Sequence, residues 1–261
     1  MQQTTLYTSK TPSADGTFDY SADENNVWRT LYTRQMAQLA PFACKAYLAG
    51  QRQLGLTAQA VPQVRDIDAA LFAATGAGVE PVAALIPQDA FSALLAARRF
   101  PVATFIRRRE HLDYIEEPDI FHEVFGHCPM LCHPAFCVFM ERFGALSLSL
   151  PPEDVKRLFR LWWFIVEFGL VQEDGRQKAF GAGIISSPSE AKHAASGQVE
   201  TLPFDLLTIF RTDYRIDILQ PVYFVIDSFE QLSASLDCDI PALLAQARTR
   251  GDLPRRFATA A

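Results

Sequence analysis

The sequence predicts a mainly α-helical domain of the α+β class, with a few short β-strands near its centre. Apolar residues recur at helical spacing over most of the chain, whereas strand-like runs are few and short. The chain has 261 residues, of which 49% are hydrophobic, so it can bury a sizeable core. No internal repeat, low-complexity tract or linker divides it. We therefore expect one helical domain.

Helix and strand signals alternate along this domain. Apolar spacing predicts helical structure over 25–54, interrupted at Pro41, and over 66–75, where Gly76 ends the helix. Several further helices begin at a proline, since its missing N–H costs nothing in a first turn. The remaining expected helices cover 87–97, 118–127, 134–148, 151–169, a segment from 187, 203–210 and 240–250, and the expected strands cover 81–86, 102–107 and 222–226.

The predicted domain spans residues 23–250. Residues 1–22 are polar and predict a flexible lead-in, and residues 251–261 predict a short C-terminal tail. The first residues lack the basic and apolar regions of a signal peptide. No apolar run approaches the ~18 residues that a membrane helix needs. We expect a cytoplasmic protein with no membrane partner.

Charge and cysteine content exclude further classes. The net charge is −6 and no basic stripe is interleaved with aromatic residues, so we expect no nucleic-acid partner. Five cysteines, an odd number without an export signal, argue against a disulfide framework. The cluster Cys128, Cys132, His133 and Cys137 matches no paired C-x2-C zinc knuckle. We interpret these thiols as small buried hydrophobic groups.

The stretch Glu-Pro-Asp-Ile-Phe-His-Glu-Val-Phe-Gly-His at 117–127 contains two candidate metal ligands. His122 and His127 are five residues apart, which separates their rings by roughly 140° on an ideal α-helix. Zinc-protease helices of the His-Glu-x-x-His type use a spacing of four, which places both rings on one face. For both rings to reach one metal ion, the last turn must loosen, and Gly126 and Pro129 flank His127 where this can happen.

A third candidate ligand is Glu167, the single carboxylate in the apolar run 161–170. A buried charge is costly unless it is paired or bound to a metal. A partly exposed Glu, or one paired with an arginine, is less favoured because no polar residue lies three or four positions away on its face. Two histidines and a carboxylate form the facial triad of non-haem Fe(II) oxygenases, but zinc enzymes also use two His and one Glu. The ligands alone do not choose between the metals.

Several motifs in order resemble the pterin-dependent aromatic amino acid hydroxylases, with the closest similarity to bacterial phenylalanine 4-hydroxylases. They cover 117–127, 163–169, Ala-Phe-Gly-Ala-Gly-Ile-Ile-Ser-Ser at 179–187, and 220–224, within a similarity that runs from about Asp19 to Leu236. The resemblance implies that family's helical catalytic domain, Fe(II), a tetrahydropterin (tetrahydrobiopterin or a bacterial analogue), and O2 as co-substrate. It also implies that the iron ligands are His122, His127 and Glu167.

The resemblance also assigns residues to the substrate. Arg107 matches an arginine that grips the substrate carboxylate, which suits its planar fork, and Asp119 would help to hold that arginine. Trp163 and Phe168 match aromatic residues that line the ring pocket. Ser186 matches a serine near the substrate and the iron-ligating histidines.

A third set of residues is matched to the pterin. Glu123 corresponds to an acidic residue that contacts the pterin through water, and Phe91 to the aromatic residue on which the pterin ring stacks. Leu85 and Ile86 correspond to the loop beside it.

The implied reaction is hydroxylation of an aromatic amino acid. Ile216 lies where tyrosine-specific relatives have an acidic residue, and an apolar side chain offers no partner for a substrate hydroxyl, so tyrosine is disfavoured. We expect phenylalanine to be converted to tyrosine, with tryptophan as an alternative substrate. A zinc hydrolase with Glu123 as general base is a more remote alternative. A non-enzymatic helical binding module would leave the lone Glu167 unexplained.

The chain also departs from the animal members of this family. Trp162 stands where these have Tyr, and Ile115 stands where they have Thr. Their N-terminal regulatory domain and C-terminal oligomerisation helix have no counterpart in this sequence. We therefore expect a monomer without phenylalanine-driven allosteric control.

Overall fold

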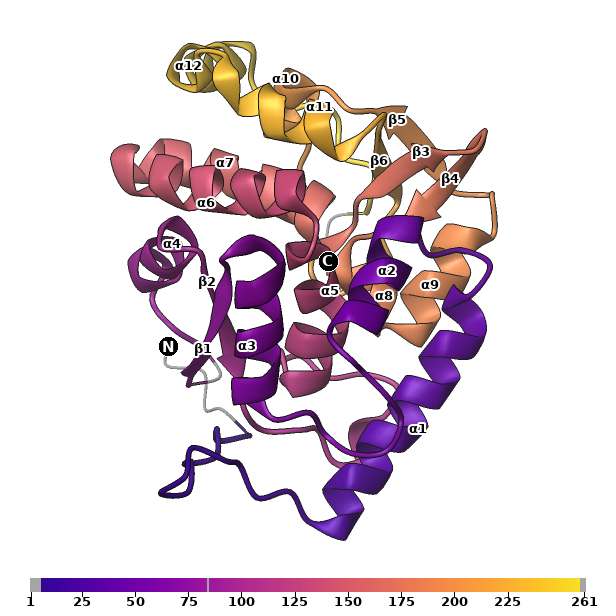
Figure 1. Cartoon of the computed structure of the whole chain (residues 1–261). Helices are drawn as coiled ribbons and strands as arrows, with labels where there is room; N and C mark the ends of the chain where they lie inside the picture. Colours follow the sequence, from indigo (N-terminus) through magenta and orange to yellow (C-terminus); the bar gives the residue numbers. More distant parts are fainter. Residues whose placement is uncertain (1–5, 84, 259–261) are drawn as a thin grey trace.

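Helices surround two small β-sheets in this protein (Figure 1). The computed structural model describes residues 6–83 and 85–258. Its first elements are α1 (Ala22–Leu39), α2 (Lys45–Gln53), α3 (Val64–Thr75), β1 (Gly78–Val82), α4 (Gln88–Ala96), β2 (Arg99–Ala103) and the 3-10 turn η1 (Arg109–His111). The central elements are η2 (Phe121–His127), α5 (Cys128–Leu131), α6 (Pro134–Ser149), α7 (Pro152–Leu161) and η3 (Trp162–Glu167).

The last elements join the larger sheet to the C-terminal helices. They are β3 (Leu170–Glu173), β4 (Arg176–Ala179), α8 (Ala182–Ser186), α9 (Pro188–Ala195), β5 (Glu200–Pro203), α10 (Leu206–Arg211), β6 (Val222–Ile226), α11 (Phe229–Ala234), η4 (Ser235–Asp237) and α12 (Ile240–Arg250). The predicted class, mainly helical with a few short strands, is confirmed. Among the described residues, no helix is both long and apolar enough to cross a membrane.

Local capping chemistry sets the helix boundaries that the sequence predicts. At α1, Ser21 and Glu24 form a capping box, in which each side chain accepts from the other residue's backbone N–H. At α3, Gly76 ends the helix with φ of 72°, a left-handed conformation that suits glycine. At α9, the Ser187 side chain accepts from the N–H of Glu190. The helical stretch around Pro41 divides into α1 and α2, as its interruption indicates.

The smaller sheet lies three residues upstream of its predicted position. We expect strands at 81–86 and 102–107, whereas β1 and β2 cover 78–82 and 99–103 and pair in parallel. Both strands contain a proline, Pro81 or Pro101. In a two-stranded sheet each strand has an unpaired edge, so a residue without an N–H can be accommodated there.

The larger sheet has the strand order β4-β3-β6-β5. β3 pairs antiparallel with β4 and parallel with β6, and β6 also pairs in parallel with β5. Only β6 is predicted, because β3, β4 and β5 have four residues each and mostly polar sequences. The prediction that Pro203 opens a helix is wrong: it ends the edge strand β5, and α10 begins after Asp205, whose side chain accepts from the N–H of Thr208.

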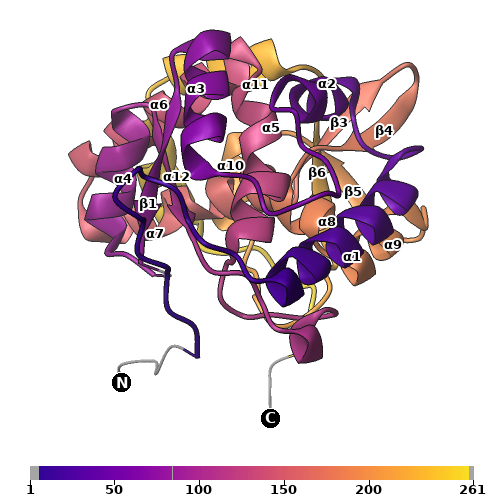
Figure 2. The ribbon, with the colours of Figure 1, turned by 60° about the horizontal axis from the view of Figure 1, so that its bottom comes forward.

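The segment before α1 packs on the domain, although its polar sequence predicts a flexible lead-in. Tyr7, Phe18 and Tyr20 are buried, and the Tyr20 hydroxyl donates to the carbonyl oxygen of Thr104 over 2.8 Å. The Ser9 hydroxyl donates to the carbonyl oxygen of Val82 at the end of β1. Figure 2 shows the segment running from β1 across to α1, which lies beside α8 and α9. The aromatic residues, rather than the polar majority, determine its packing.

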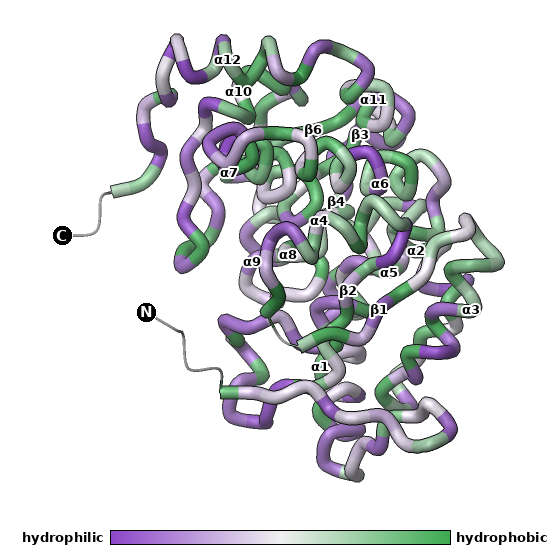
Figure 3. Tube along the Cα trace, turned by 90° about the vertical axis from the view of Figure 1, so that its left-hand side faces the viewer, coloured by the Kyte–Doolittle hydropathy of each residue, from purple (hydrophilic) through white to green (hydrophobic). Residues whose placement is uncertain are grey.

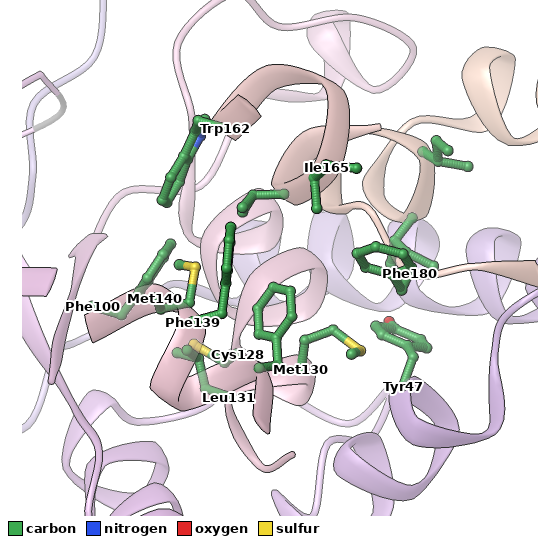
Figure 4. Close-up of a cluster of buried hydrophobic side chains, with 14 of the residues drawn as sticks. Tyr47, Phe100, Cys128, Met130, Leu131, Phe139, Met140, Trp162, Ile165 and Phe180 are labelled. Carbon is green, nitrogen blue, oxygen red and sulfur yellow. The ribbon is translucent and has the colours of Figure 1, made fainter. Parts of the chain in front are cut away.

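One apolar core connects the two sheets and the central helices. β6 is buried along its whole length, whereas α3 and α12 alternate polar and hydrophobic residues and lie at the outside (Figure 3). Within the core, a cluster of side chains from α2, β2, α5, α6 and η3 packs between the central helices (Figure 4). Its labelled members are Tyr47, Phe100, Cys128, Met130, Leu131, Phe139, Met140, Trp162, Ile165 and Phe180. The core therefore surrounds η2 and η3.

Small residues let α8 approach both of these central turns. A Cβ atom added at Gly181 would lie 2.4 Å from the backbone nitrogen of Gly169 and 2.5 Å from the carbonyl oxygen of Glu167. A Cβ atom at Gly126 would lie 3.1 Å from the Cβ of Ala182. The small residues of the 179–187 motif thus allow backbone to touch backbone at the centre of the fold.

We predict that Gly181→Ala lowers the free energy of unfolding by about 2 to 3 kcal/mol, because backbone atoms cannot move aside as a flexible side chain can. Urea denaturation measures this change. The control is Gly175→Ala, where no atom lies within 4 Å and the cost is the left-handed φ of 72° alone. That cost is about 1 kcal/mol. Equal losses in the two variants would contradict the close approach at α8.

Candidate functional site

The predicted ligands lie on two π-helical turns. In η2, the N–H of Cys128 donates to the carbonyl oxygen of Glu123, five residues earlier. In η3, the N–H of Phe168 donates in the same way to the carbonyl oxygen of Trp163 over 3.1 Å. A π turn contains more residues than an α turn, so side chains five apart lie on one face. This is the loosening that the spacing of His122 and His127 requires.

A proline explains why the first of these turns widens. In a continuous α-helix the nitrogen of Pro129 would have to donate to the carbonyl oxygen of Phe125, but proline has no N–H. The hydroxyl of Tyr47, from α2, donates to this carbonyl over 2.9 Å instead. Tyr47 is fully buried, and Gln51 donates to its hydroxyl. The freed backbone group is therefore satisfied inside the core.

Three ligand atoms converge between the two turns. Nε2 of His122 lies 3.1 Å from Nε2 of His127. The two oxygens of Glu167 each face one of these nitrogens: Oε2 lies 3.6 Å from that of His122, and Oε1 lies 3.3 Å from that of His127. Ligands bound about 2.1 Å from one ion are about 3.0 Å apart in octahedral and about 3.4 Å apart in tetrahedral geometry. The three distances fit one metal ion and leave its coordination number open.

A second carboxylate lies beside this group. An oxygen of Glu123 is within 4.8 Å of the ligand atoms of both histidines. Burial raises the pKa of Glu123 well above its usual value, and the charge of Glu167 raises it further. Burial also raises the pKa of Glu167, but the nearby His127 and His122 outweigh it and lower this pKa to about 2. Glu167 is ionised and its two oxygens lie 3.6 Å and 3.3 Å from the histidine nitrogens, so it stays the predicted third ligand.

Neighbouring groups orient the ligands. The Oγ of Ser186 lies 2.9 Å from Nδ1 of His122, the ring nitrogen that faces away from the other ligands. Burial lowers the pKa of His122 to about 4, which keeps the imidazole neutral, as a metal ligand must be. The indole Nε1–H of Trp162, five residues before Glu167, donates to the Oε1 of Glu167 over 2.9 Å. Such partners fix the orientation of a ligand.

Arg107 and Asp119 form a buried ion pair next to this centre. Nε and Nη2 of Arg107 donate to the two carboxylate oxygens of Asp119, each over 2.8 Å. Asp119 also accepts from the backbone N–H of His122 over 3.0 Å and from that of Arg107. The pair leaves Nη1 outside the fork, so the guanidinium keeps one edge for a further partner.

A cavity of about 500 Å³ opens next to these groups. It brings together most of the predicted metal and substrate residues: Arg107, His122, Trp163, Glu167, Phe168 and Ser186. The rings of Trp163 and Phe168 lie 4.7 Å apart and form an aromatic wall. Ile216 also lines the cavity, and its side chain is 62% exposed at the rim. Asp119 does not line the cavity, but it holds Arg107, which does.

Known proteins are similar to this chain in sequence and in fold. Residues 5–238 match the sequence profile of the family described as biopterin-dependent aromatic amino acid hydroxylase. A phenylalanine-4-hydroxylase of Vibrio cholerae is 48% identical over 97% of this chain and 88% of its own. Phenylalanine hydroxylase from Legionella pneumophila superposes with a TM-score of 0.93 at 44% identity, covering 96% of this chain and all of its own.

The chain belongs to the biopterin-dependent aromatic amino acid hydroxylases. A Chromobacterium violaceum phenylalanine hydroxylase with bound Fe(III) also has this fold, with a TM-score of 0.88 at 38% identity, covering 96% of this chain and 94% of its own. Membership of this family makes the chain a pterin-dependent monooxygenase, and it favours iron over zinc where the ligand distances do not choose.

The residues that this hydroxylase is predicted to use for the pterin lie outside the cavity lining. Leu85 is 53% exposed, and Ile86 beside it is partly buried. Phe91 packs edge-on against Trp162, with ring centroids 4.8 Å apart, and Trp162 in turn donates to Glu167. Trp162 therefore lies between Phe91 and Glu167 and contacts both.

Two cavity residues of this hydroxylase, Glu117 and Glu190, and Gln220 behind the cavity wall are absent from the sequence-based prediction. Oε2 of Glu117 is buried without a hydrogen-bond partner, while its Oε1 accepts from the N–H of Leu6. Glu190 lines the cavity from α9 and accepts from Tyr223. Gln220 accepts from the indole of Trp163. Gln220 lies in the 220–224 motif, but sequence reasoning gave it no role because its partners are distant in the chain.

We predict that Asp119→Asn lowers the free energy of unfolding by about 3 kcal/mol or more, because it leaves the buried guanidinium of Arg107 without its counter-charge. Chemical denaturation of the purified variant measures the loss. The matched control is Asp113→Asn, which breaks the exposed pair with Arg34, where the Asp113 side chain is 91% exposed. Such surface pairs contribute about 0 to 1 kcal/mol. A loss as small as the control's would show that Asp119 is not needed to compensate Arg107.

Proposed function

We propose that the chain is a phenylalanine 4-monooxygenase, which converts L-phenylalanine to L-tyrosine with O2, Fe(II) and a tetrahydropterin. The observation that carries this proposal is the convergence of two imidazoles and one carboxylate beside a cavity that is also lined by a buried arginine. The relatives named phenylalanine-4-hydroxylase support the substrate, since the one from Vibrio cholerae is 48% identical over 97% of this chain.

His122, His127 and Glu167 are the proposed iron ligands. When bound, the iron and the pterin supply the reduction of O2 and the transfer of one oxygen atom to the ring. These three residues would hold the iron and would leave coordination positions free for other ligands. Ser186 holds the His122 ring and Trp162 holds the Glu167 carboxylate in place through the hydrogen bonds described above.

Arg107 is the proposed partner of the substrate carboxylate. Its Nη1 edge is free of the Asp119 pair, and a guanidinium already fixed by a buried carboxylate loses little freedom on binding. Asp119 also accepts from the backbone of His122, so the substrate-binding arginine and one iron ligand share a support. This link sets the distance between the amino acid end of the substrate and the metal.

Trp163 and Phe168 are the proposed wall against which the substrate ring packs. Trp163 lies in η3 and Phe168 directly follows it, so the same turn that presents Glu167 also presents the aromatic surface. Holding the ring within van der Waals contact of the metal centre orients it for the reaction. Ile216 at the rim offers no hydrogen-bond partner to a phenol, which favours phenylalanine over tyrosine.

The proposed pterin site lies on the α4 side of the metal centre. Phe91 lies there as a stacking surface, with Leu85 and Ile86 on the loop before it. Glu123 lies within 4.8 Å of both histidine ligands and is proposed to contact the pterin through water. The proposed domain boundaries, a monomeric state and a cytoplasmic location stay predictions that limited proteolysis, sedimentation and cell fractionation would check.

We predict that iron-loaded protein given a tetrahydropterin and air forms tyrosine from L-phenylalanine. Mass and retention time identify the product, and omission of iron or pterin should abolish it. Product from tryptophan alone would keep the family and change the substrate. No product from any aromatic amino acid, together with zinc in the freshly purified protein, would contradict the proposal.

We predict that Glu167→Ala lowers iron affinity by at least about a hundredfold, because loss of a partner that merely orients a ligand already costs up to that factor. Turnover should fall with iron occupancy, while the far-ultraviolet circular dichroism stays unchanged. Metal analysis after dialysis measures the occupancy. Glu153→Ala, an exposed glutamate in the first turn of α7, is the matched control. Stoichiometric iron and normal turnover in Glu167→Ala would exclude this residue as a ligand.

A further inference from the structure

We propose that Gln220 is a positioning residue that holds the wall and the rim of the substrate cavity in one fixed arrangement. The inference rests on the proposed function, because it assigns to Gln220 the placement of the substrate ring. Gln220 is only 1% exposed and does not line the cavity. It acts through residues that do.

The Gln220 side chain makes three hydrogen bonds, which link the aromatic wall to a loop at the rim of the cavity. Its Oε1 accepts from the indole Nε1–H of Trp163 over 2.9 Å. Its Nε2 donates to the carbonyl oxygens of Arg215 and Ile218, each over 3.0 Å. One amide therefore joins the aromatic wall to the loop 215–219, which carries Ile216 at the rim.

The Gln220 backbone fixes this amide to the surrounding elements. Its N–H donates to the Oε1 of Glu190 over 3.1 Å, and its carbonyl oxygen lies 3.1 Å from Nε2 of His193. Oε1 of Glu190 also accepts from the hydroxyl of Tyr223, in β6, over 2.5 Å. Gln220 is thus held by α9 and, through Glu190, by the central sheet.

Most partners of Gln220 belong to the cavity lining. Trp163, Glu190 and residues 216–219 all line the cavity. The loop presents two exposed apolar side chains, Ile216 and Leu219, which bury little surface of their own. Its position therefore depends on hydrogen bonds, and the Gln220 side chain supplies two of them. A buried amide that only filled space would not need to connect these parts.

The arrangement makes a specific functional prediction. If the wall and the rim move relative to each other, the substrate ring is held less accurately against the metal centre. A misplacement of about 1 Å can cost about a hundredfold in rate. The pterin does not contact Gln220 in the proposed site, so oxidation of the pterin should continue while hydroxylation of the ring falls. Uncoupling of the two is the signature that distinguishes positioning from a general loss of structure.

Two substitutions remove different hydrogen bonds of the Gln220 side chain. Gln220→Glu has nearly the same shape and keeps an acceptor for Trp163, but it places an oxygen against both loop carbonyls. Gln220→Met is apolar and removes all three side-chain bonds. We expect kcat/KM for L-phenylalanine to fall about tenfold in Gln220→Glu and further in Gln220→Met, since each leaves buried groups unpaired. Tetrahydropterin consumed per tyrosine formed should rise in both.

Two further measurements accompany the kinetics. Iron content should equal that of the wild type, because Gln220 contacts none of the proposed iron ligands, and calorimetry should show weaker binding of L-phenylalanine. The matched controls are Gln177→Glu and Gln177→Met, since Gln177 is exposed and donates to Thr201 far from the cavity. If Gln220→Met does not fold, Gln220→Glu alone decides.

Unchanged kcat/KM, coupling ratio and phenylalanine affinity in folded, iron-loaded Gln220→Glu would overturn the proposal. So would a loss that merely follows the fraction of unfolded protein. Wild-type protein assayed in parallel keeps the two proposals separate. If it does not hydroxylate phenylalanine, the proposed function fails, whereas a defect confined to the Gln220 variants supports the positioning role.

Discussion

The two widened turns of η2 and η3 set the geometry on which the rest of the site depends. On regular α-helices, His122 and His127 would point in directions roughly 140° apart, and Trp162 could not reach the carboxylate of Glu167 five residues later. Because each turn is a π turn, the two histidine nitrogens lie 3.1 Å apart and each lies within 3.6 Å of one oxygen of the Glu167 carboxylate. Irregular turns of this kind are weaker than α-helical turns and need support from their surroundings.

That support comes from segments distant in the sequence. Tyr47 of α2 satisfies the carbonyl of Phe125 that Pro129 cannot serve. The glycines of the 179–187 motif let α8 pack against the backbone of both turns, and Ser186 at its end reaches His122. Asp119 accepts hydrogen bonds both from the backbone of His122, at the start of η2, and from the Arg107 side chain. Each support also contributes a group to the cavity or orients one, so folding and site assembly use the same contacts.

The sequence predicts the parts of this arrangement that depend on local chemistry. The spacing of the histidines requires a loosened turn, the lone Glu167 in an apolar run indicates a buried ligand, and capping residues place most helix boundaries. It fails where long-range pairing decides. The strands β3, β4 and β5 are short and rich in polar residues, so only their pairing within the sheet β4-β3-β6-β5 defines them. The lead-in packs through three aromatic residues that a polar composition conceals.

Gln220 illustrates the same limit within the site. Its sequence neighbourhood is part of a recognisable motif, yet its role depends on Trp163, 57 residues earlier, and on loop carbonyls that no side-chain pattern reveals. Glu117 is similar, because its Oε1 accepts from the N–H of Leu6, which is 111 residues earlier in the chain. Ligand residues can be read from local sequence, whereas the residues that position them cannot.

The most direct test of this account is anomalous diffraction at the iron edge from crystals of the iron-loaded protein. The account predicts one strong peak about 2.1 Å from Nε2 of His122, Nε2 of His127 and an oxygen of Glu167. It also predicts that both π turns persist with the metal bound. Iron held by Glu123 in place of Glu167, or histidine rings that face away from a common centre, would contradict it.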